Sequence, residues 1–159
     1  MDISFISEDT GWVITHNGKI LSTVDGGINW NTQYENKLDK FNCIYFYDSE
    51  SGWVGGEEGN ILYTYNSGKS WFRQPTGIVT DINKIFFIEP FWGWAAGNGK
   101  TIIHSVNGGY SWNIQLTSEF QNRNNFNDIL FKDRKIGWSA GNNSIVYFTC
   151  LLYTSDAAD

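Results

Sequence analysis

Few residues in this sequence have the types and spacing that catalysis or metal binding requires. The adjacent carboxylates Glu57 and Glu58 lie between two glycines. An acid and a base act from opposite sides of a substrate, so neighbouring carboxylates favour a solvated turn instead. His16 and His104 are the only histidines, and neither has a Cys, His or acidic partner at the spacing of a metal site. The glycine clusters precede strand-like segments, so no phosphate-binding loop, cofactor site or metal site is predicted.

The cysteines predict neither a nucleophile nor an internal disulfide. Cys43 lies inside the alternating apolar run 41–46, whereas a reactive thiol needs a nearby histidine and electropositive surroundings. We expect Cys43 to pack in the core, as free cysteines commonly do. The only other cysteine, Cys150, lies in the C-terminal segment discussed below.

An internal repeat supplies the elements that position these residues. Gly-Trp pairs recur at steps of 41, 41 and 44 residues, with their tryptophans at Trp12, Trp53, Trp94 and Trp138. A second tryptophan series keeps the step of 41 and consists of Trp30, Trp71 and Trp112. A phenylalanine lies seven residues before each Gly-Trp tryptophan, at Phe5, Phe46, Phe87 and Phe131. The three extra residues before the fourth unit predict a loop insertion near 118–125.

The pattern within each unit indicates four short strands. Apolar and polar residues alternate with period two, and Asn-Gly and Asp-Gly turns separate the runs. The first unit predicts strands near 3–6, 11–15, 19–23 and 29–33. Units of four antiparallel strands at this period are typical of propeller blades. We therefore predict an all-β fold, a β-propeller fragment of about three and a half to four four-stranded antiparallel blades, with units at about 3–40, 41–81, 82–125 and 126–149.

The strongest motif is Ser/Thr-x-Asp/Asn-x-Gly-x-x-Trp, present at 23–30, 64–71 and 105–112. The short side chain at the third position can hydrogen-bond the backbone of its own turn, and the tryptophan can cover that turn. Because Asn66 and Asn107 replace Asp25 without a charge, the motif requires an acceptor and not an acid. The predicted structural residues are Thr23, Asp25, Gly27, Trp30, Thr64, Asn66, Gly68, Trp71, Ser105, Asn107, Gly109 and Trp112.

These residues resemble the Asp-box, or bacterial neuraminidase repeat, and the surrounding frame is similar to the photosystem II stability/assembly factor family. The resemblance covers residues 3–149. It implies a non-catalytic scaffold that binds a protein, with further blades of the same propeller as partners and no cofactor. The net charge of −6 departs from the basic surface of that family. Bacterial surface proteins with the same repeats imply an extracellular or periplasmic location.

Sialidases share this fold and motif, so a glycoside hydrolase or a glycan-binding propeller is the alternative. That resemblance implies three convergent arginines, a tyrosine nucleophile backed by a glutamate, and an aspartate acid/base. The only arginines are Arg73, Arg123 and Arg134, of which the first belongs to the repeated outer-strand frame. Bidentate recognition of a carboxylate needs convergent guanidinium groups. Nothing in the sequence makes these three converge, so no catalytic residue is predicted.

Contacts with a protein or glycan partner are expected from unit-specific loops on one face. The candidate contacts are Trp92, Phe120 and Arg123. The 11 Lys and Arg residues are scattered and outnumbered by 17 Asp and Glu residues, which excludes the basic patch of a nucleic-acid binder. No apolar run is long enough for a transmembrane segment.

The last ten residues, 150–159, are expected not to belong to the repeat. Thr149 occupies the first position of a fourth Asp-box, but Leu151, Tyr153 and Asp156 stand where the motif has Asp or Asn, Gly and Trp. The segment resembles the translation of a sequencing-library adapter and is left out of the fold prediction.

Overall fold

The computed structural model describes residues 1–117 and 124–150 and is all-β over those ranges. The first sheet consists of β1 (Asp2–Phe5), β2 (Gly11–Ile14), β3 (Lys19–Thr23) and β4 (Asn31–Glu35). The second consists of β5 (Phe41–Phe46), β6 (Gly52–Gly56), β7 (Ile61–Thr64) and β8 (Phe72–Gln74). The third consists of β9 (Ile82–Phe87), β10 (Gly93–Gly97), β11 (Thr101–Ser105) and β12 (Asn113–Leu116). The fourth consists of β13 (Phe126–Phe131), β14 (Ile136–Gly141) and β15 (Val146–Cys150).

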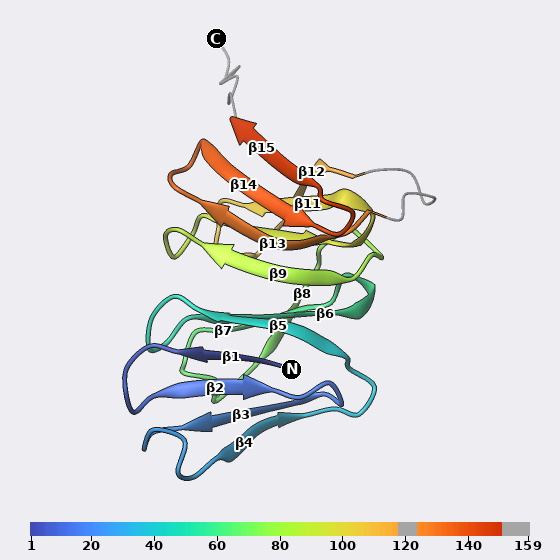
Figure 1. The fold of residues 1–159 in the computed structure, drawn as a ribbon. Coiled ribbons are helices and arrows are strands. Elements are labelled where there is room, and N and C mark those ends of the chain that lie inside the picture. Colours follow the sequence, from blue (N-terminus) through green and yellow to red (C-terminus); the bar gives the residue numbers. More distant parts are fainter. Residues whose placement is uncertain (118–123, 151–159) are drawn as a thin grey trace.

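The sheets are successive blades of a propeller, numbered here 1 to 4 in chain order. Within each blade the strands pair antiparallel in sequence order. The first strands β1, β5, β9 and β13 follow one another, so that each blade packs beside the next (Figure 1). This architecture confirms the predicted three four-stranded blades and most of a fourth.

In the first unit the strand positions agree with the sequence prediction to within about two residues. The outermost strands β4 and β8 begin at Asn31 and Phe72, each directly after the Asp-box tryptophan, which was expected to lie inside the strand. The helical segments in the described ranges are two single 3₁₀ turns, η1 (Glu57–Gly59) and η2 (Asn98–Lys100).

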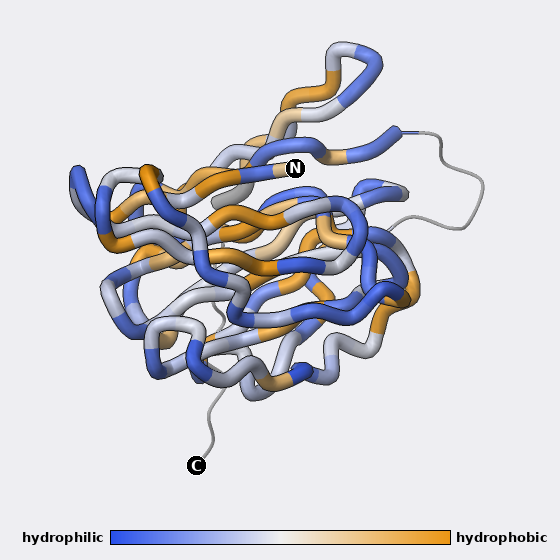
Figure 2. Tube along the Cα trace, turned by 90° about the horizontal axis from the view of Figure 1, so that it is seen from below, coloured by the Kyte–Doolittle hydropathy of each residue, from blue (hydrophilic) through white to orange (hydrophobic). Residues whose placement is uncertain are grey.

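The hydrophobic core lies between the blades. Figure 2 shows apolar residues along the middles of the strands and hydrophilic residues at the turns. Because each blade is a single sheet, it buries its apolar faces only against its neighbours. Three clusters of buried side chains therefore occupy the three junctions, and each takes residues from both blades that it joins.

At every junction a Gly-Trp tryptophan stacks on a phenylalanine of the next blade. The ring centroids lie 3.5 Å apart for Trp12 and Phe46, 3.6 Å for Trp53 and Phe87, and 3.6 Å for Trp94 and Phe131. The interplanar angles are 7°, 12° and 8°. The repeated tryptophans and phenylalanines thus make contacts between adjacent units.

The stacked phenylalanine has two further neighbours in its own blade. Trp71, the Asp-box tryptophan of blade 2, meets Phe46 edge-on at 88°, with centroids 6.0 Å apart. Gly52, the Gly-Trp glycine of blade 2, lies against the same ring, where an added Cβ would overlap the phenylalanine. Since the corresponding contacts recur in blade 3, the recurring Phe, Gly and Trp form one packing unit.

Side chains of the first strands also bond the next blade. Asn42 donates to the carbonyl of Ile82 at 3.1 Å, and Asn83 donates to the carbonyl of Phe126 at 2.8 Å. These bonds satisfy backbone groups on the open edge of each first strand, which would otherwise be available for pairing with another chain.

The outer strands of blades 1 and 2 each contribute a glutamine to the junction with the following blade. Gln33 and Gln74 lie against Gly68 and Gly109, the Asp-box glycines of the following blades, and an added Cβ at either glycine would overlap the glutamine amide. At Gly27, in blade 1, an added Cβ would be 3.4 Å from the nearest atom, a ring carbon of Trp30. All three glycines have positive φ, of 89° for Gly27, 82° for Gly68 and 90° for Gly109.

We predict that the stacks dominate the stability of the arc. Trp53→Ala removes a fully buried ring and should lower the free energy of unfolding by about 3–5 kcal/mol. Trp138→Ala should cost less than half as much, since Trp138 is 39 % exposed and no further blade covers it in the described ranges. Urea unfolding followed by far-UV circular dichroism measures both variants, and equal losses would contradict the role of the stack.

Alanine at the Asp-box glycines should separate backbone strain from the fit between blades. Gly27→Ala, Gly68→Ala and Gly109→Ala share a left-handed backbone cost of about 1–2 kcal/mol. The variants at 68 and 109 should lose about 1–3 kcal/mol more, because only they overlap a glutamine. Chemical denaturation tests this, with Gly27→Ala as the matched control; three equal losses would show that the glutamine contact is immaterial.

Candidate functional site

The Asp-box turns are closed by their own side chains. Thr23 Oγ1 accepts from the backbone N–H of Gly27 at 2.9 Å, and Asp25 Oδ1 accepts from the N–H of Asn29 at 2.9 Å. Asn66 Oδ1 and Asn107 Oδ1 accept the corresponding bonds, each at 2.9 Å. The predicted side-chain to backbone bonds are therefore present, with an aspartate in one turn and asparagines in two. Because the bonds from Asn29 and Thr23 stabilise its carboxylate, the pKa of Asp25 lies below its usual value.

The turns also bind the preceding blade. The indole N–H of Trp12 donates to the carbonyl of Ser67 at 3.2 Å, and that of Trp53 donates to the carbonyl of Gly108 at 3.1 Å. Ser67 and Gly108 occupy the fourth position of their Asp-boxes. These bonds between blades were not predicted from the sequence, because periodicity does not reveal contacts between units.

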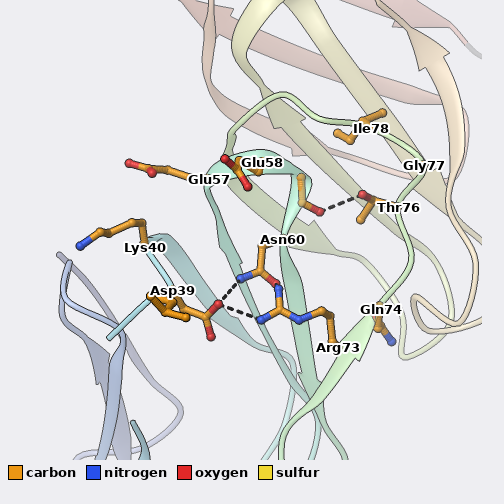
Figure 3. A pocket seen from close by; sticks show the side chains of 12 residues that line it. Asp39, Lys40, Glu57, Glu58, Asn60, Arg73, Gln74, Thr76, Gly77 and Ile78 are labelled. Atoms are coloured by element: carbon orange, nitrogen blue, oxygen red, sulfur yellow. Dashed lines mark hydrogen bonds and ion pairs between the residues drawn. The ribbon is translucent and has the colours of Figure 1, made fainter. Parts of the chain in front are cut away.

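A hollow of about 430 Å³ lies between the loop 38–40, which joins blades 1 and 2, and residues 57–60 and 73–78 of blade 2 and the segment after it (Figure 3). Its polar centre is Asp39, which is 7 % exposed. Asp39 accepts from Arg73 Nη2 at 2.8 Å, from Asn60 Nδ2 at 3.2 Å and from the Tyr34 hydroxyl at 2.7 Å. Burial and the bond to Asp39 raise the pKa of Tyr34.

This arrangement is a structural ion pair that fastens the loop after blade 1 to the outer strand of blade 2. Figure 3 shows Asp39, Asn60 and Arg73 directed toward one another, with Glu57 and Glu58 on the rim. Both glutamates are exposed on η1. A glycosidase needs two carboxyl groups facing each other across the substrate, whereas here the buried carboxylate is bonded on both oxygens.

Arg134 belongs to a second ion pair, at the junction of blades 3 and 4. Its Nε and Nη2 donate to the two carboxylate oxygens of Glu89 at 3.1 and 2.5 Å. The guanidinium carbon lies 4.5 Å from the ring centroid of Trp92, within the range of a cation–π contact. The pair lowers the pKa of Glu89. Arg73 and Arg134 are thus each bonded to a carboxylate, while Arg123 lies outside the described residues.

The candidate binding residues have different positions. Trp92 is half-buried against Arg134 of blade 4 and His104 of blade 3. Phe120, like Arg123, lies outside the described residues, as does most of the predicted insertion.

Cys43 is buried at the junction of blades 2 and 3, and burial raises the pKa of its thiol to about 12. The burial of Cys43 in this cluster agrees with the predicted core packing.

A group of exposed aromatic side chains was not predicted. Tyr65, Phe72 and Tyr110 surround the half-buried Tyr63 at the outer edge of blades 2 and 3. They border a hollow of about 280 Å³. The signal in the sequence is a departure from the repeat, because the same positions in other units are mostly not aromatic.

The fold and the Asp-box geometry together define a BNR-type β-propeller. Residues 1–78 match a family model described as photosynthesis system II assembly factor YCF48. The chain therefore resembles the photosystem II assembly factors, and the match covers just under half of it. A search of the curated proteins finds no match.

Solved structures show the same fold. YCF48 bound to D1 peptide has a TM-score of 0.65 and 19% sequence identity over 93% of this chain. YCF48 from Cyanidioschyzon merolae has a TM-score of 0.74 and 17% identity over 94% of this chain. The chain spans 63% and 50% of the length of these two proteins. An ancestral GH74 enzyme has a TM-score of 0.77 and 16% identity over 93% of this chain and 22% of its own. These likenesses establish the fold alone.

We predict that His104 makes the stability of the fold depend on pH. His104 is 4 % exposed between Trp92 and Trp94, and burial lowers its pKa to about 4. The unfolded chain binds this proton below about pH 6.5, so stability should fall as the pH drops from 6.5 toward 4, by up to about 3 kcal/mol. His104→Tyr introduces the residue that blade 2 has at this position, Tyr63. This variant should lose most of the pH dependence of stability between pH 6.5 and 4. Denaturation at several pH values measures the slope, His16→Gln controls for loss of a histidine, and an unchanged slope in His104→Tyr would refute the assignment.

Proposed function

We propose that this chain is a non-catalytic scaffold propeller that binds an extended segment of a protein partner. The resemblance to the YCF48 family supports this function, and the solved complex of YCF48 with a D1 peptide provides a parallel. In this proposal further propeller blades are also partners. Blades 1 and 4 each contact one other blade in the described ranges, so each has a second face that a further blade could cover.

The observation that carries the proposal is the engagement of both described arginines. Arg73 is bonded to the buried Asp39, and Arg134 is bonded to Glu89 through two nitrogens. Moving either guanidinium to a substrate would leave a carboxylate without its partner, and for the buried Asp39 that is costly. These cations therefore stabilise the junctions between blades, which suits a rigid frame for binding.

The glycoside hydrolase remains the alternative because a GH74 enzyme has the same fold. Likeness at 16% identity carries no catalytic residue with it.

The same bacterial repeats lead us to propose an extracellular or periplasmic location. Among the described residues there is no helix with the length and apolar character needed to cross a membrane.

The binding function predicts selective recognition of a peptide without turnover. The full chain should bind the labelled D1 peptide of the YCF48 complex saturably in fluorescence polarisation, and more tightly than a scrambled peptide of the same composition. It should not hydrolyse a fluorogenic sialoside or xyloglucan above the buffer rate. Hydrolysis proportional to protein concentration would favour the enzyme, and equal affinity for the scrambled peptide would exclude specific recognition.

A further inference from the structure

Blade 2 departs from the repeat at positions where the other blades are mostly small, aliphatic or polar. Three of its residues are aromatic there, and blade 3 adds a fourth. Tyr63 corresponds to Ser22, His104 and Phe148, Tyr65 to Val24 and Val106, Phe72 to Asn31 and Asn113, and Tyr110 to Ile28 and Lys69. The fold tolerates non-aromatic residues at each position, so the blade frame does not require these rings.

The four rings form one continuous surface, here called the aromatic platform and defined as Tyr63, Tyr65, Phe72 and Tyr110. Tyr65 and Phe72 stack at 11° with centroids 5.5 Å apart. The ring centroid of Tyr63 lies 6.3 Å from that of Tyr65 in blade 2 and 6.2 Å from that of Tyr110 in blade 3. Tyr63 therefore bridges the two blades. Tyr65, Phe72 and Tyr110 are 53%, 46% and 68% exposed. Clustered aromatic rings open to solvent are typical of interaction sites.

The side chains of Arg73 and Gln74 in the hollow beside the platform already have partners. The Arg73 guanidinium bonds Asp39 and Asn60, and the Gln74 amide bonds the carbonyl of Gly108 and the indole of Trp112. A sugar ring bound in the hollow would bring several hydroxyl groups that Arg73 and Gln74 do not pair, and each one left unpaired is costly. A proline ring brings no donor and packs on aromatic faces, as in the grooves that recognise polyproline helices.

The rim of the platform is acidic. Asp48 and Glu50 are exposed on the turn between β5 and β6. This turn lies against the Asp-box of blade 2, because the carbonyl of Glu50 accepts from the N–H of Ser67 at 3.0 Å. Burial raises the pKa of Tyr63, and the nearby Asp48 carboxylate adds to that rise. With a net charge of −6 for the chain, this rim complements a cationic ligand.

We infer that the aromatic platform binds a proline-containing peptide segment with flanking Lys or Arg residues. The inference rests on the proposed protein-binding function and names the site and the ligand chemistry. A proline ring occupies the hollow between Phe72 and Tyr110, and a cationic side chain faces Asp48 and Glu50. The polyproline backbone forms no internal hydrogen bonds, so tyrosine hydroxyls at the edge of the platform can donate to its carbonyls.

The test measures binding of a labelled oligoproline peptide with N-terminal lysines to the full chain by fluorescence polarisation. Tyr65→Val with Phe72→Asn introduces residues that blades 1 and 3 already carry, so the fold should persist. This double variant should bind at least about tenfold more weakly. Tyr110→Ile, the residue of blade 1, tests the other wall of the hollow independently. Phe148→Ala removes an exposed ring in blade 4 and should bind as the wild type does.

Charge and chemistry are tested with matched probes. Glu50→Gln should lower the affinity for the lysine-bearing peptide a few fold and reduce the salt dependence of binding. A peptide with alanine in place of proline should bind at least about tenfold more weakly than the proline peptide. Equal affinity for both peptides, or wild-type affinity in the double and Tyr110→Ile variants, would overturn the inference. Binding of neutral xyloglucan oligosaccharides that is lost in the same variants would make the platform a glycan site and would also overturn it.

The D1 peptide separates this inference from the proposed function. If the wild type and the double variant bind that peptide equally and neither binds oligoproline, the platform is excluded while the scaffold function stands. If the chain binds neither peptide, both proposals fail.

Discussion

The parallel stack of a tryptophan on a phenylalanine of the next blade is the contact on which this architecture depends. A blade is a single sheet and has no interior, so its apolar faces are buried only when another blade covers them. The stack fixes the spacing of adjacent blades, since two flat rings in contact at 3.5 Å admit no intervening side chain. The glycine before each tryptophan follows from the same contact, because the phenylalanine of its own blade occupies the space of a Cβ.

The frame and the variable surface of the molecule carry different information. Tryptophan, phenylalanine, glycine and the Asp-box residues recur because every junction needs the same contacts. The arginines of the described ranges extend this frame with ion pairs, so neither their charge nor their position marks a catalytic centre. Function in such a protein resides where the units differ. The sharpest difference in the described residues is the aromatic platform of blades 2 and 3.

Most of the fold was predictable from the sequence because the repeat is nearly exact. The step of 41 residues, the alternation within each unit and the turn residues predicted the blades, their strands and the turn bonds of Asp25, Asn66 and Asn107. Periodicity does not distinguish a contact within a unit from the same contact one unit later, so the partner blade of Trp12 and the position of Gln33 against Gly68 were not predicted. The ion pair of Asp39 and Arg73 joins residues 34 apart whose types do not recur at the equivalent positions of the other units, and no local pattern indicates it. The aromatic platform was not predicted, because a repeat pattern identifies recurring residues and the platform residues depart from it.

The contacts between blades join nearest neighbours only, in the part of the chain that the structure describes, and this makes the arc a one-dimensional array. In such an array the stability of a unit grows with the number of its interfaces. Blades 2 and 3 each have two interfaces, whereas blades 1 and 4 each have one in the described ranges. Opening should therefore begin at the two outer blades and reach the inner pair last, so that amide protons of β6, β7, β10 and β11 exchange most slowly. The aromatic platform spans these two inner blades, so it occupies the segment of the arc that would stay folded through partial opening.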